Sequence, residues 1–305
     1  MKGLMLALIF SSQILYSQNE IAIFYAKKTV SSVSAKGADA VTIAPFNILN
    51  GMIIVRASID GVPGNYVLDT GAPGVVINSK KHKKKGRYSA SSVGGALAIG
   101  EVKIRQFKWG IIEKKRLQGF AIDISHLESA AGIKLAGLIG YEVLKEYEVL
   151  FDYPNKLVKI YSAKEGKIFR YGEKAQEVHF TMNGHVPIIP VKVGSKKCYL
   201  GLDSGAEVNL LDESYFDSLK KSYLKNRHKE VVIGLDQKKQ HVVSASLKSS
   251  HIKKMNLPEM KFLFMDLGEL GAESGVRMDG LLGFPFFQKH AVSINYLEKK
   301  VYIWD

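Results

Sequence analysis

The chain has 305 residues, carries 43 Lys and Arg against 29 Asp and Glu for a formal net charge of +14, and contains one Cys. A hydrophobic content of 46% is enough for a packed core and excludes a disordered chain. The single Cys excludes both a disulfide framework and a zinc site with four thiolate ligands. The length allows one large domain or two of medium size.

The N-terminus has the pattern of a secretory signal peptide. Met1 and Lys2 give a short positive start, residues 3–15 are largely apolar, and Ser17 is a small residue suited to cleavage. The apolar stretch is too short, and too often interrupted by polar residues, to span a membrane. We therefore expect residues 1–17 to be a signal peptide and the mature protein to be exported, either periplasmic or secreted. The alternative is a buried N-terminal helix, and the sequence assigns no role to the extension formed by residues 18–44.

Most of the remaining chain has the pattern of short β-strands. Residues 53–59 are rich in β-branched side chains and are followed by Asp60-Gly61, a hairpin turn signal. Residues 89–95 are small and polar and lack strand alternation, which returns in residues 98–104. Apolar residues at helical spacing predict a helix within residues 212–224.

Three sequence landmarks occur twice in the same order, which indicates an internal duplication. Each copy has an Asn-Gly pair, then an Asp-hydroxyl-Gly-Ala loop, then an apolar strand ending in Gly. The first copy contains Asn50-Gly51, Asp69-Thr70-Gly71-Ala72 and Gly137-Leu138-Ile139-Gly140, and the second contains Asn183-Gly184, Asp203-Ser204-Gly205-Ala206 and Gly280-Leu281-Leu282-Gly283. We expect an all-β chain with two related lobes, residues 45–161 and 178–305, joined by a polar linker at residues 162–177.

The two Asp loops are the strongest candidate for chemistry. Asp69 and Asp203 each follow an apolar strand, where a carboxylate is costly unless it is hydrogen-bonded. Thr70 and Ser204 can supply hydroxyl groups, and the next residue in each loop, Gly, lets the backbone approach closely. If the loops meet across a pseudo-twofold axis, the adjacent carboxyls cannot both ionise, so the pair offers an acid and a base together. Such a pair can activate a water molecule against a peptide carbonyl.

These two loops, together with the two downstream apolar-apolar-Gly strands, resemble those of the aspartic proteases. The detail is most similar to the retropepsin-like branch of bacterial secreted proteins, in which a Gly-Leu-Ile-Gly strand and an Asp-Tyr…Lys strand resemble residues 137–161, with Asp152-Tyr153 and Lys156. The resemblance covers about residues 45–161 and 178–304. It implies a bilobal acid-protease fold of two β-barrel lobes with a substrate cleft between them.

The resemblance also implies the roles of the site residues. Asp69 and Asp203 would be the catalytic pair, Thr70, Gly71, Ser204 and Gly205 would support their loops, and Gly140 and Gly283 would mark the strands packed against those loops. The family uses neither a metal nor an organic cofactor, its substrates are peptides or proteins, and a monomer containing both lobes would suffice. The competing reading of the two motifs is a pair of ordinary turns, since Asp, Ser, Thr and Gly all favour turns.

Three departures from the family pattern bear on activity. Ala72 and Ala206 offer no side-chain donor to the carboxylates, so we expect a less acidic pair and activity at mildly acidic to near-neutral pH. Glu207 would disturb the pair if it pointed inward. No flap over the site is obvious, although residues 92–95 and 234–238 are candidates from their glycine content and position.

Other functions have weaker support. The basic run at residues 80–87 could contact an anionic surface, but it lacks interleaved aromatic residues and suits a solvated loop better than a nucleic-acid site. The eight His residues show no paired spacing that would predict a metal site. The sequence thus favours an aspartic endopeptidase over a non-catalytic peptide- or ligand-binding envelope protein with the same fold. An adhesin that uses the basic run is a weaker third reading.

Overall fold

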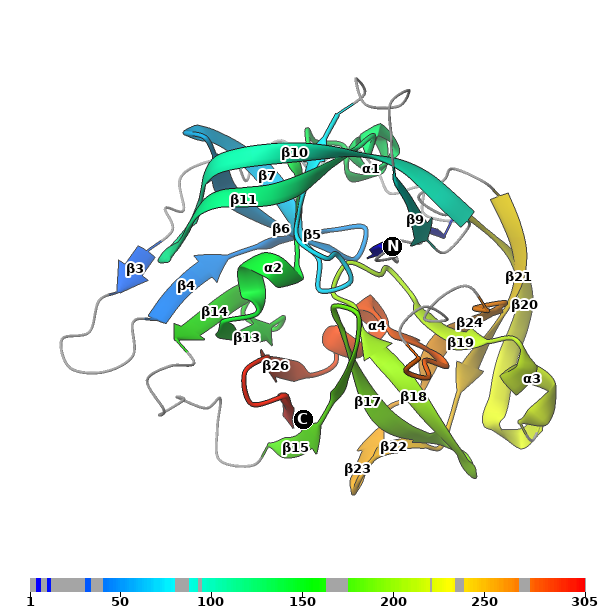
Figure 1. The fold of residues 1–305 in the computed structure, drawn as a ribbon. Coiled ribbons are helices and arrows are strands. Elements are labelled where there is room, and N and C mark those ends of the chain that lie inside the picture. Colours follow the sequence, from blue (N-terminus) through cyan, green and yellow to red (C-terminus); the bar gives the residue numbers. More distant parts are fainter. Residues whose placement is uncertain are drawn as a thin grey trace.

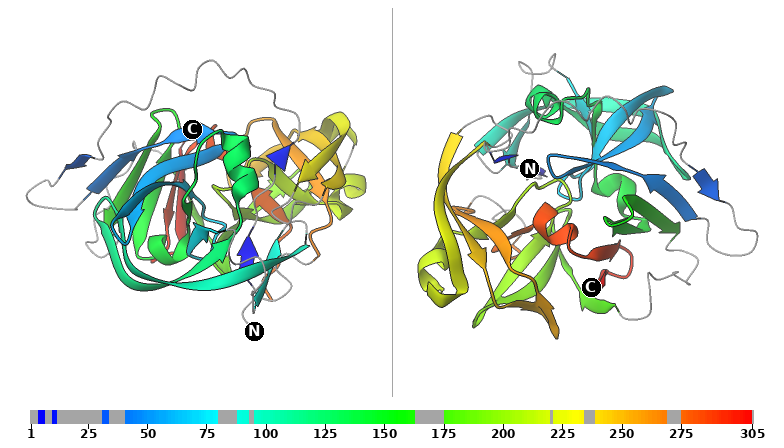
Figure 2. Two further views of the ribbon diagram at one scale, coloured as in Figure 1. Left: turned by 90° about the horizontal axis from the view of Figure 1, so that it is seen from above. Right: turned by 180° about the vertical axis from the view of Figure 1, so that it is seen from behind.

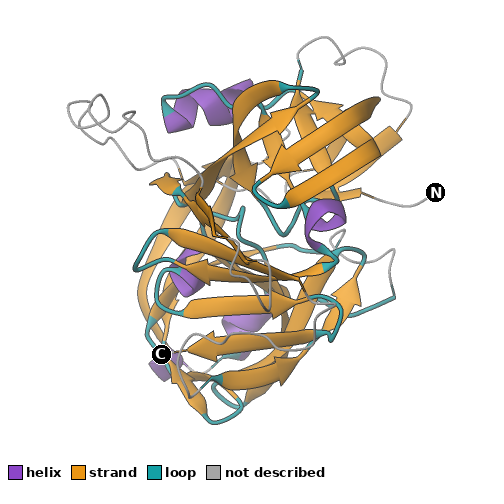
Figure 3. Cartoon of the chain, turned by 90° about the vertical axis from the view of Figure 1, so that its left-hand side faces the viewer, coloured by secondary structure: helices purple, strands orange, loops and turns teal. Residues whose placement is uncertain are grey.

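The computed structural model describes residues 4–6, 10–11, 31–33, 41–79, 88–92, 95–162, 175–219, 221–233, 239–268 and 275–304. Strands dominate and the helices are short, as Figure 3 shows. The strands form three sheets, one in each lobe and one between them. The N-terminal and C-terminal lobes lie beside one another in both views of Figure 2.

The N-terminal lobe is built on a nine-stranded sheet with the order β1-β9-β10-β11-β8-β12-β7-β6-β5. Its strands are β1 (Leu4–Leu6), β5 (Asn47–Leu49), β6 (Met52–Ile59), β7 (Val62–Leu68), β8 (Val75–Asn78), β9 (Tyr88–Ser92), β10 (Gly95–Trp109), β11 (Ile112–Ile122) and β12 (Gly137–Ile139). Helix α1 (Ser125–Ala131) links β11 to β12, and α2 (Tyr141–Leu144) begins directly after the Gly of the first apolar-apolar-Gly strand.

The C-terminal lobe is built on an eleven-stranded sheet, in which β16 pairs with β17 beside the main order β2-β20-β21-β24-β19-β25-β18-β17-β22-β23. Its strands are β2 (Phe10–Ser11), β16 (Thr181–Asn183), β17 (Val186–Val193), β18 (Lys196–Leu202), β19 (Asn209–Asp212), β20 (Leu224–Ile233), β21 (Lys239–Leu247), β22 (Ser250–Ile252), β23 (Met255–Leu257), β24 (Met260–Met265) and β25 (Gly280–Leu282). Its helices are α3 (Ser214–Ser218), the 3-10 turn Lys221–Tyr223, and α4 (Phe284–Phe287).

A third sheet contains strands from both halves of the sequence (Figure 1). Its order is β15-β27-β26-β13-β14-β4-β3, with β3 (Ser31–Val33), β4 (Val41–Pro45), β13 (Tyr147–Asp152), β14 (Leu157–Ser162), β15 (Gln176–His179), β26 (Ala291–Asn295) and β27 (Lys300–Trp304). At its centre β13 pairs with β26, and Leu150 lies opposite Ser293. These two residues occupy equivalent positions after the two Gly strands, so the pseudo-twofold axis passes through this pair.

The duplication seen in the sequence is present in the strand pairing. In the N-terminal lobe, β12 lies between β7, to which it is parallel, and β8, to which it is antiparallel. In the C-terminal lobe, β25 lies in the same way between β18 and β19. The chain therefore has the all-β, two-lobed architecture that the sequence predicts. The domain boundaries remain a prediction, and strand β4 spans the one predicted at residues 44 and 45.

One hydrophobic core joins the three sheets. Its largest cluster includes Val55 from the N-terminal sheet, Phe151 from the central sheet and Leu202 from the C-terminal sheet. The rings of Phe151 and Phe287 pack edge to face with centroids 5.3 Å apart, so α4 is anchored on the central sheet. This shared core fixes the lobes against each other and therefore sets the relative position of the two Asp loops.

Two local expectations were wrong. The predicted helix within residues 212–224 is reduced to α3 and the 3-10 turn, and Leu224 begins strand β20, because the apolar residues there pack on a sheet. The segment 89–95, which lacks strand alternation, contains most of strand β9, paired with β10. No helix within the described ranges is long and apolar enough to cross a membrane.

Candidate active site

The structure brings Asp69 and Asp203 together at the centre of the molecule. Asp69 follows β7 and its N–H donates to the carbonyl of Ile139 on β12, 2.9 Å away; Asp203 follows β18 and its N–H donates to the carbonyl of Leu282 on β25, 3.0 Å away. Both side chains are completely buried, each carboxyl lies against the Gly of the opposite loop, and the two carboxyls are close enough to influence each other's pKa. Each loop is thus fixed by the strand beside it, and the apolar-apolar-Gly motif of each lobe supplies that strand.

The hydroxyl residues next to the aspartates interlock the two loops. The Thr70 hydroxyl donates to the carbonyl of Leu202 at 2.9 Å and accepts from the N–H of Ser204 at 2.9 Å. The Ser204 hydroxyl donates to the carbonyl of Leu68 at 2.8 Å and accepts from the N–H of Thr70 at 3.1 Å. Every bond in this set crosses from one lobe to the other. Both hydroxyls are fully buried, so these contacts hold the loops in one relative position.

The glycines after the hydroxyl residues allow the close approach of the two carboxyls. The N–H of Gly71 donates to Oδ1 of Asp69 at 2.8 Å, and the N–H of Gly205 donates to Oδ1 of Asp203 at 2.9 Å. A Cβ on Gly71 would lie 2.4 Å from Oδ2 of Asp203, which no side chain could tolerate. The glycines that end the apolar strands pack equally closely on the carbonyls of the loop alanines, Gly140 on Ala72 and Gly283 on Ala206.

The environment keeps a proton on the aspartate pair. Burial raises the pKa of Asp69, and burial together with the neighbouring Asp69 charge raises the pKa of Asp203 well above its ordinary value. The Oδ2 atoms of both residues are buried and receive no hydrogen bond from any other group in the described part of the chain. One proton between the two carboxyls satisfies these atoms and leaves one carboxyl charged and the other neutral.

Several residues around the pair were missed at the sequence level. His185 is buried, and its Nε2 lies 2.7 Å from the carbonyl oxygen of Gly71 in the other lobe; because a carbonyl only accepts, Nε2 carries a hydrogen. Asn209 is fully buried, and its Oδ1 accepts from the N–H of Gly283 at 2.9 Å. His185 follows the second Asn-Gly landmark directly, so the duplication itself could have marked that position.

Two buried tyrosines lie close enough to the pair to feel its charge. Burial raises the pKa of both Tyr153 and Tyr296, and the charge of Asp203 adds to the shift in each. They occupy equivalent positions in the two copies. The hydroxyl oxygens of both are buried without a hydrogen-bond partner in the described residues.

The structure describes Glu207 and the strands beside the two flap candidates, which were named above as departures from the family pattern. Glu207 is nearly buried and packs beside Gly51 and the ring of Phe284, and it is not among the groups that shift the pKa of either aspartate. The strands on either side of each flap candidate pair with each other, Ser92 with Gly95 and Ile233 with Lys239. Residues 93–94 and 234–238 lie outside the described residues, as does the basic run at 80–87. No cluster of three metal-binding side chains occurs in the part of the chain that the structure covers.

Comparisons with known proteins agree with this geometry. Residues 189–286, which contain the second Asp loop and the second Gly strand, match the family model described as aspartyl protease. The chain is similar in fold to the crystal structure of an aspartic proteinase from Irpex lacteus, with a TM-score of 0.53, 10% sequence identity, and coverage of 87% of this chain and 97% of that one. No curated protein matches the sequence. One third of the chain thus matches an aspartyl protease family model, and the chain as a whole is similar in fold to an aspartic proteinase.

Proposed function

We propose that the chain is an aspartic endopeptidase and that Asp69 and Asp203 activate the water that cleaves the peptide bond. The observation that carries this proposal is the proximity of the two carboxyls: both are buried, each influences the pKa of the other, and their loops interlock across the lobes. A pair with one proton supplies a base and an acid at a single point. No other cluster in the described residues combines these properties.

The reaction follows from that protonation state. The ionised carboxyl takes a proton from water as the oxygen bonds to the scissile carbonyl carbon, and the neutral carboxyl gives its proton to the carbonyl oxygen. The resulting diol collapses when the C–N bond breaks: the amine leaves with a proton from the pair, and one diol hydroxyl gives its proton back to the pair as the carboxyl product forms. One proton then remains on the pair, so the site returns to its starting state. The N–H groups of Gly71 and Gly205 hold the Oδ1 atoms throughout.

Peptide cleavage by the purified protein tests the proposal. The protein is incubated with a peptide library at values from about pH 3 to 8, together with Asp69→Asn, Asp203→Asn and the exposed control Asp217→Asn. We expect the first two substitutions each to lower kcat by at least about 1,000-fold. The two carboxyls act as one unit, so replacing either of them removes the acid–base function of the pair. The control should retain full activity. Cleavage that survives either dyad substitution would assign the chemistry elsewhere, and peptide binding without cleavage would favour the non-catalytic binding protein.

We also propose that residues 1–17 act as a signal peptide and that the mature protein is exported. Strands β1 and β2 belong to this segment, and they pair with β9 and β20 of the two hairpins. Cleavage after Ser17 would remove them and leave the edges of both hairpins open for a peptide substrate to pair with. Intact mass measurement and N-terminal sequencing of protein recovered from the periplasm or medium test this. Recovery of the chain with Met1 in place would contradict it.

A further inference from the structure

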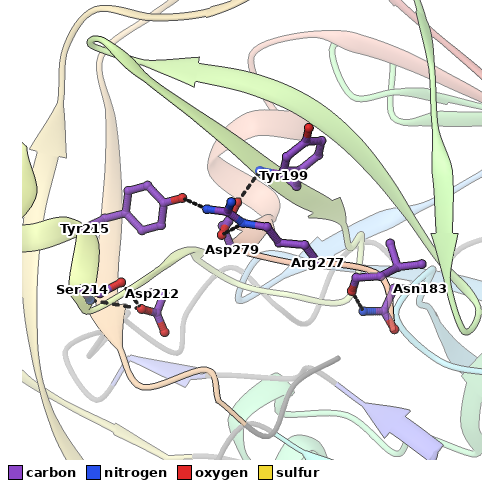
Figure 4. Close-up of polar contacts among 8 residues, drawn as sticks. Asn183, Tyr199, Asp212, Ser214, Tyr215, Arg277 and Asp279 are labelled. Carbon is purple, nitrogen blue, oxygen red and sulfur yellow. Dashed lines mark hydrogen bonds and ion pairs between the residues drawn. The ribbon is translucent and has the colours of Figure 1, made fainter. Parts of the chain in front are cut away.

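A second site lies in the C-terminal lobe, away from the aspartate pair. A cavity of about 530 Å³ opens between the start of β18, the start of α3 and the segment before β25. This volume is in the range of small-molecule and side-chain binding pockets. Three cationic side chains line it, Lys196, Lys197 and Arg277, together with the carboxylates Asp212 and Asp279. We call it the Arg277 pocket (Figure 4).

The two carboxylates of the pocket already have donors from the protein. Asp279 is buried and accepts from Nε of Arg277 at 2.7 Å and from the N–H of Tyr199 at 2.8 Å. Asp212 accepts from the N–H of Ser214 at 3.1 Å and from the N–H of Leu267 at 3.1 Å. Figure 4 shows the contacts of Arg277 and Tyr199 with Asp279 and the contact of Ser214 with Asp212. Neither carboxylate is therefore free to serve as a cation site.

The cationic side chains keep N–H donors and positive charge that the two carboxylates of the pocket do not occupy. Arg277 uses Nε on Asp279 and donates from Nη2 to the Tyr215 hydroxyl at 2.8 Å, which leaves further N–H groups of the guanidinium for a ligand. The exposed Lys196 and Lys197 have no carboxylate within ion-pair distance among the described residues. Lys197 and Arg277 both lie against the ring of Tyr199, at 5.1 and 5.8 Å from its centroid. The Tyr199 ring therefore holds the positive charges of Lys197 and Arg277 near each other, and a bound anion would offset their repulsion.

We propose that the Arg277 pocket binds a carboxylate side chain of an acidic peptide. Three cations against two carboxylates leave one positive charge, which matches one carboxylate better than a doubly charged phosphate. Leu267, Val276 and Met278 line the same cavity and suit the aliphatic stem of a Glu side chain. The guanidinium of Arg277 is pre-oriented by Asp279 and Tyr215, so little conformational entropy is lost on binding.

The cationic end of the pocket lies away from the aspartate pair, whereas Met278 lies near Gly201, two residues before Asp203. Lys196 and Lys197 stand at the first end of β18, whereas Asp203 follows its last residue, Leu202. With a rise of about 3.3 Å per residue, the strand separates Lys197 from Asp203 by roughly 20 Å. Nδ2 of Asn183 donates a hydrogen bond to the carbonyl of Val276 at 3.0 Å, and this bond holds the segment that carries Arg277. Binding at this pocket needs no peptide cleavage, so the inference stands independently of the proposed function.

Direct binding measurements test the proposal. A fluorescein-labelled peptide containing Glu residues is titrated with the full chain carrying Asp203→Asn, so that the peptide stays intact, and anisotropy gives Kd. The same peptide with Gln in place of Glu is the ligand control. The double variant Lys196→Gln/Lys197→Gln removes two pocket charges from exposed positions and leaves the buried Asp279 paired. Lys253→Gln/Lys254→Gln, in an exposed turn of the same lobe, is the matched charge control.

We expect the Glu peptide to bind at least about tenfold more tightly than the Gln peptide, because charge-assisted hydrogen bonds are lost in the latter. The pocket variant should weaken Glu-peptide binding by a similar factor, the matched control should not, and binding should weaken as salt rises. Inorganic phosphate at the same concentration as the Glu peptide should displace little of it. Equal binding of the two peptides, equal effects of the two double variants, or displacement by phosphate as effective as by unlabelled Glu peptide would each overturn the proposal.

Discussion

At the scale of single residues, the site depends on two carboxyls that are buried where charges are costly. Burial raises the pKa of Asp69 from an ordinary value of 3.8 to about 6, and burial together with the charge of Asp69 raises the pKa of Asp203 well above its ordinary value. Between about pH 4 and 6 the native state therefore holds protons that the unfolded chain has lost. Stability from this pair is complete below the unfolded pKa and is lost as pH rises through the folded pKa.

This linkage predicts the behaviour of Asp69→Asn. Asn resembles the neutral carboxyl in shape, so the variant should match the parent in stability at about pH 4 and exceed it at pH 7 by on the order of 2 kcal/mol. Thermal unfolding at the two pH values measures the difference, and the exposed Asp217→Asn should follow the parent at both. A variant less stable than the parent at neutral pH would show that the buried charges are not a cost to the fold.

A second prediction at the scale of single residues concerns His185. Its Nε2–H donates to the carbonyl of Gly71 in the opposite lobe. Replacing it by Leu removes this donor, and a buried carbonyl left unpaired costs about 1–3 kcal/mol. His185→Gln keeps an amide donor and should lose much less. Urea denaturation of both variants gives the two free energies of unfolding, and equal losses would mean that this hydrogen bond adds nothing measurable.

At the scale of elements, the ends of β7 and β18 act as one unit. Each strand end presents a carbonyl to the hydroxyl of the other loop, and each hydroxyl also accepts an N–H from that loop. The arrangement explains why a short hydroxyl residue follows each Asp. Its length matches the distance to the strand across the axis, and a longer side chain would separate the carboxyls.

Substitution of Thr70 tests this unit. Thr70→Val keeps the shape but leaves the carbonyl of Leu202 and the N–H of Ser204 unpaired, so we expect a loss of about 2–4 kcal/mol in the free energy of unfolding. Thr70→Ser retains the hydroxyl and should lose less than half as much. Chemical denaturation followed by fluorescence provides the comparison. If the Val and Ser variants are equally stable, the interlock contributes through packing alone.

At the scale of the whole molecule, repetition made much of the fold predictable. The paired landmarks were enough to predict two β-rich lobes and to bring Asp69 near Asp203, because equivalent motifs in a duplicated chain meet at its axis. His185 and Asn209 escaped prediction since their partners, the carbonyl of Gly71 and the N–H of Gly283, are backbone groups that no side-chain pattern marks. The Arg277 pocket escaped for a related reason: Lys196, Tyr215 and Arg277 are far apart in the sequence and converge only when β18 lies beside β25.

From the strand pairing in the central sheet we predict that neither half of the chain is stable alone. β13 from the first half pairs along its length with β26 from the second, and the buried carboxylate of Glu148 accepts hydrogen bonds from Ser293 and Asn295 across that junction. Separating the halves would expose an apolar strand edge and remove the Ser293 and Asn295 donors from this buried carboxylate. The chain is therefore divided within the predicted linker at residues 162–177, and each half is expressed alone and together with the other. We expect each half alone to be insoluble or to lack a cooperative thermal transition, and the two expressed together to copurify as one folded complex. A single half that unfolds cooperatively by itself would mean that each lobe has a sufficient core and that the central sheet joins two independent domains.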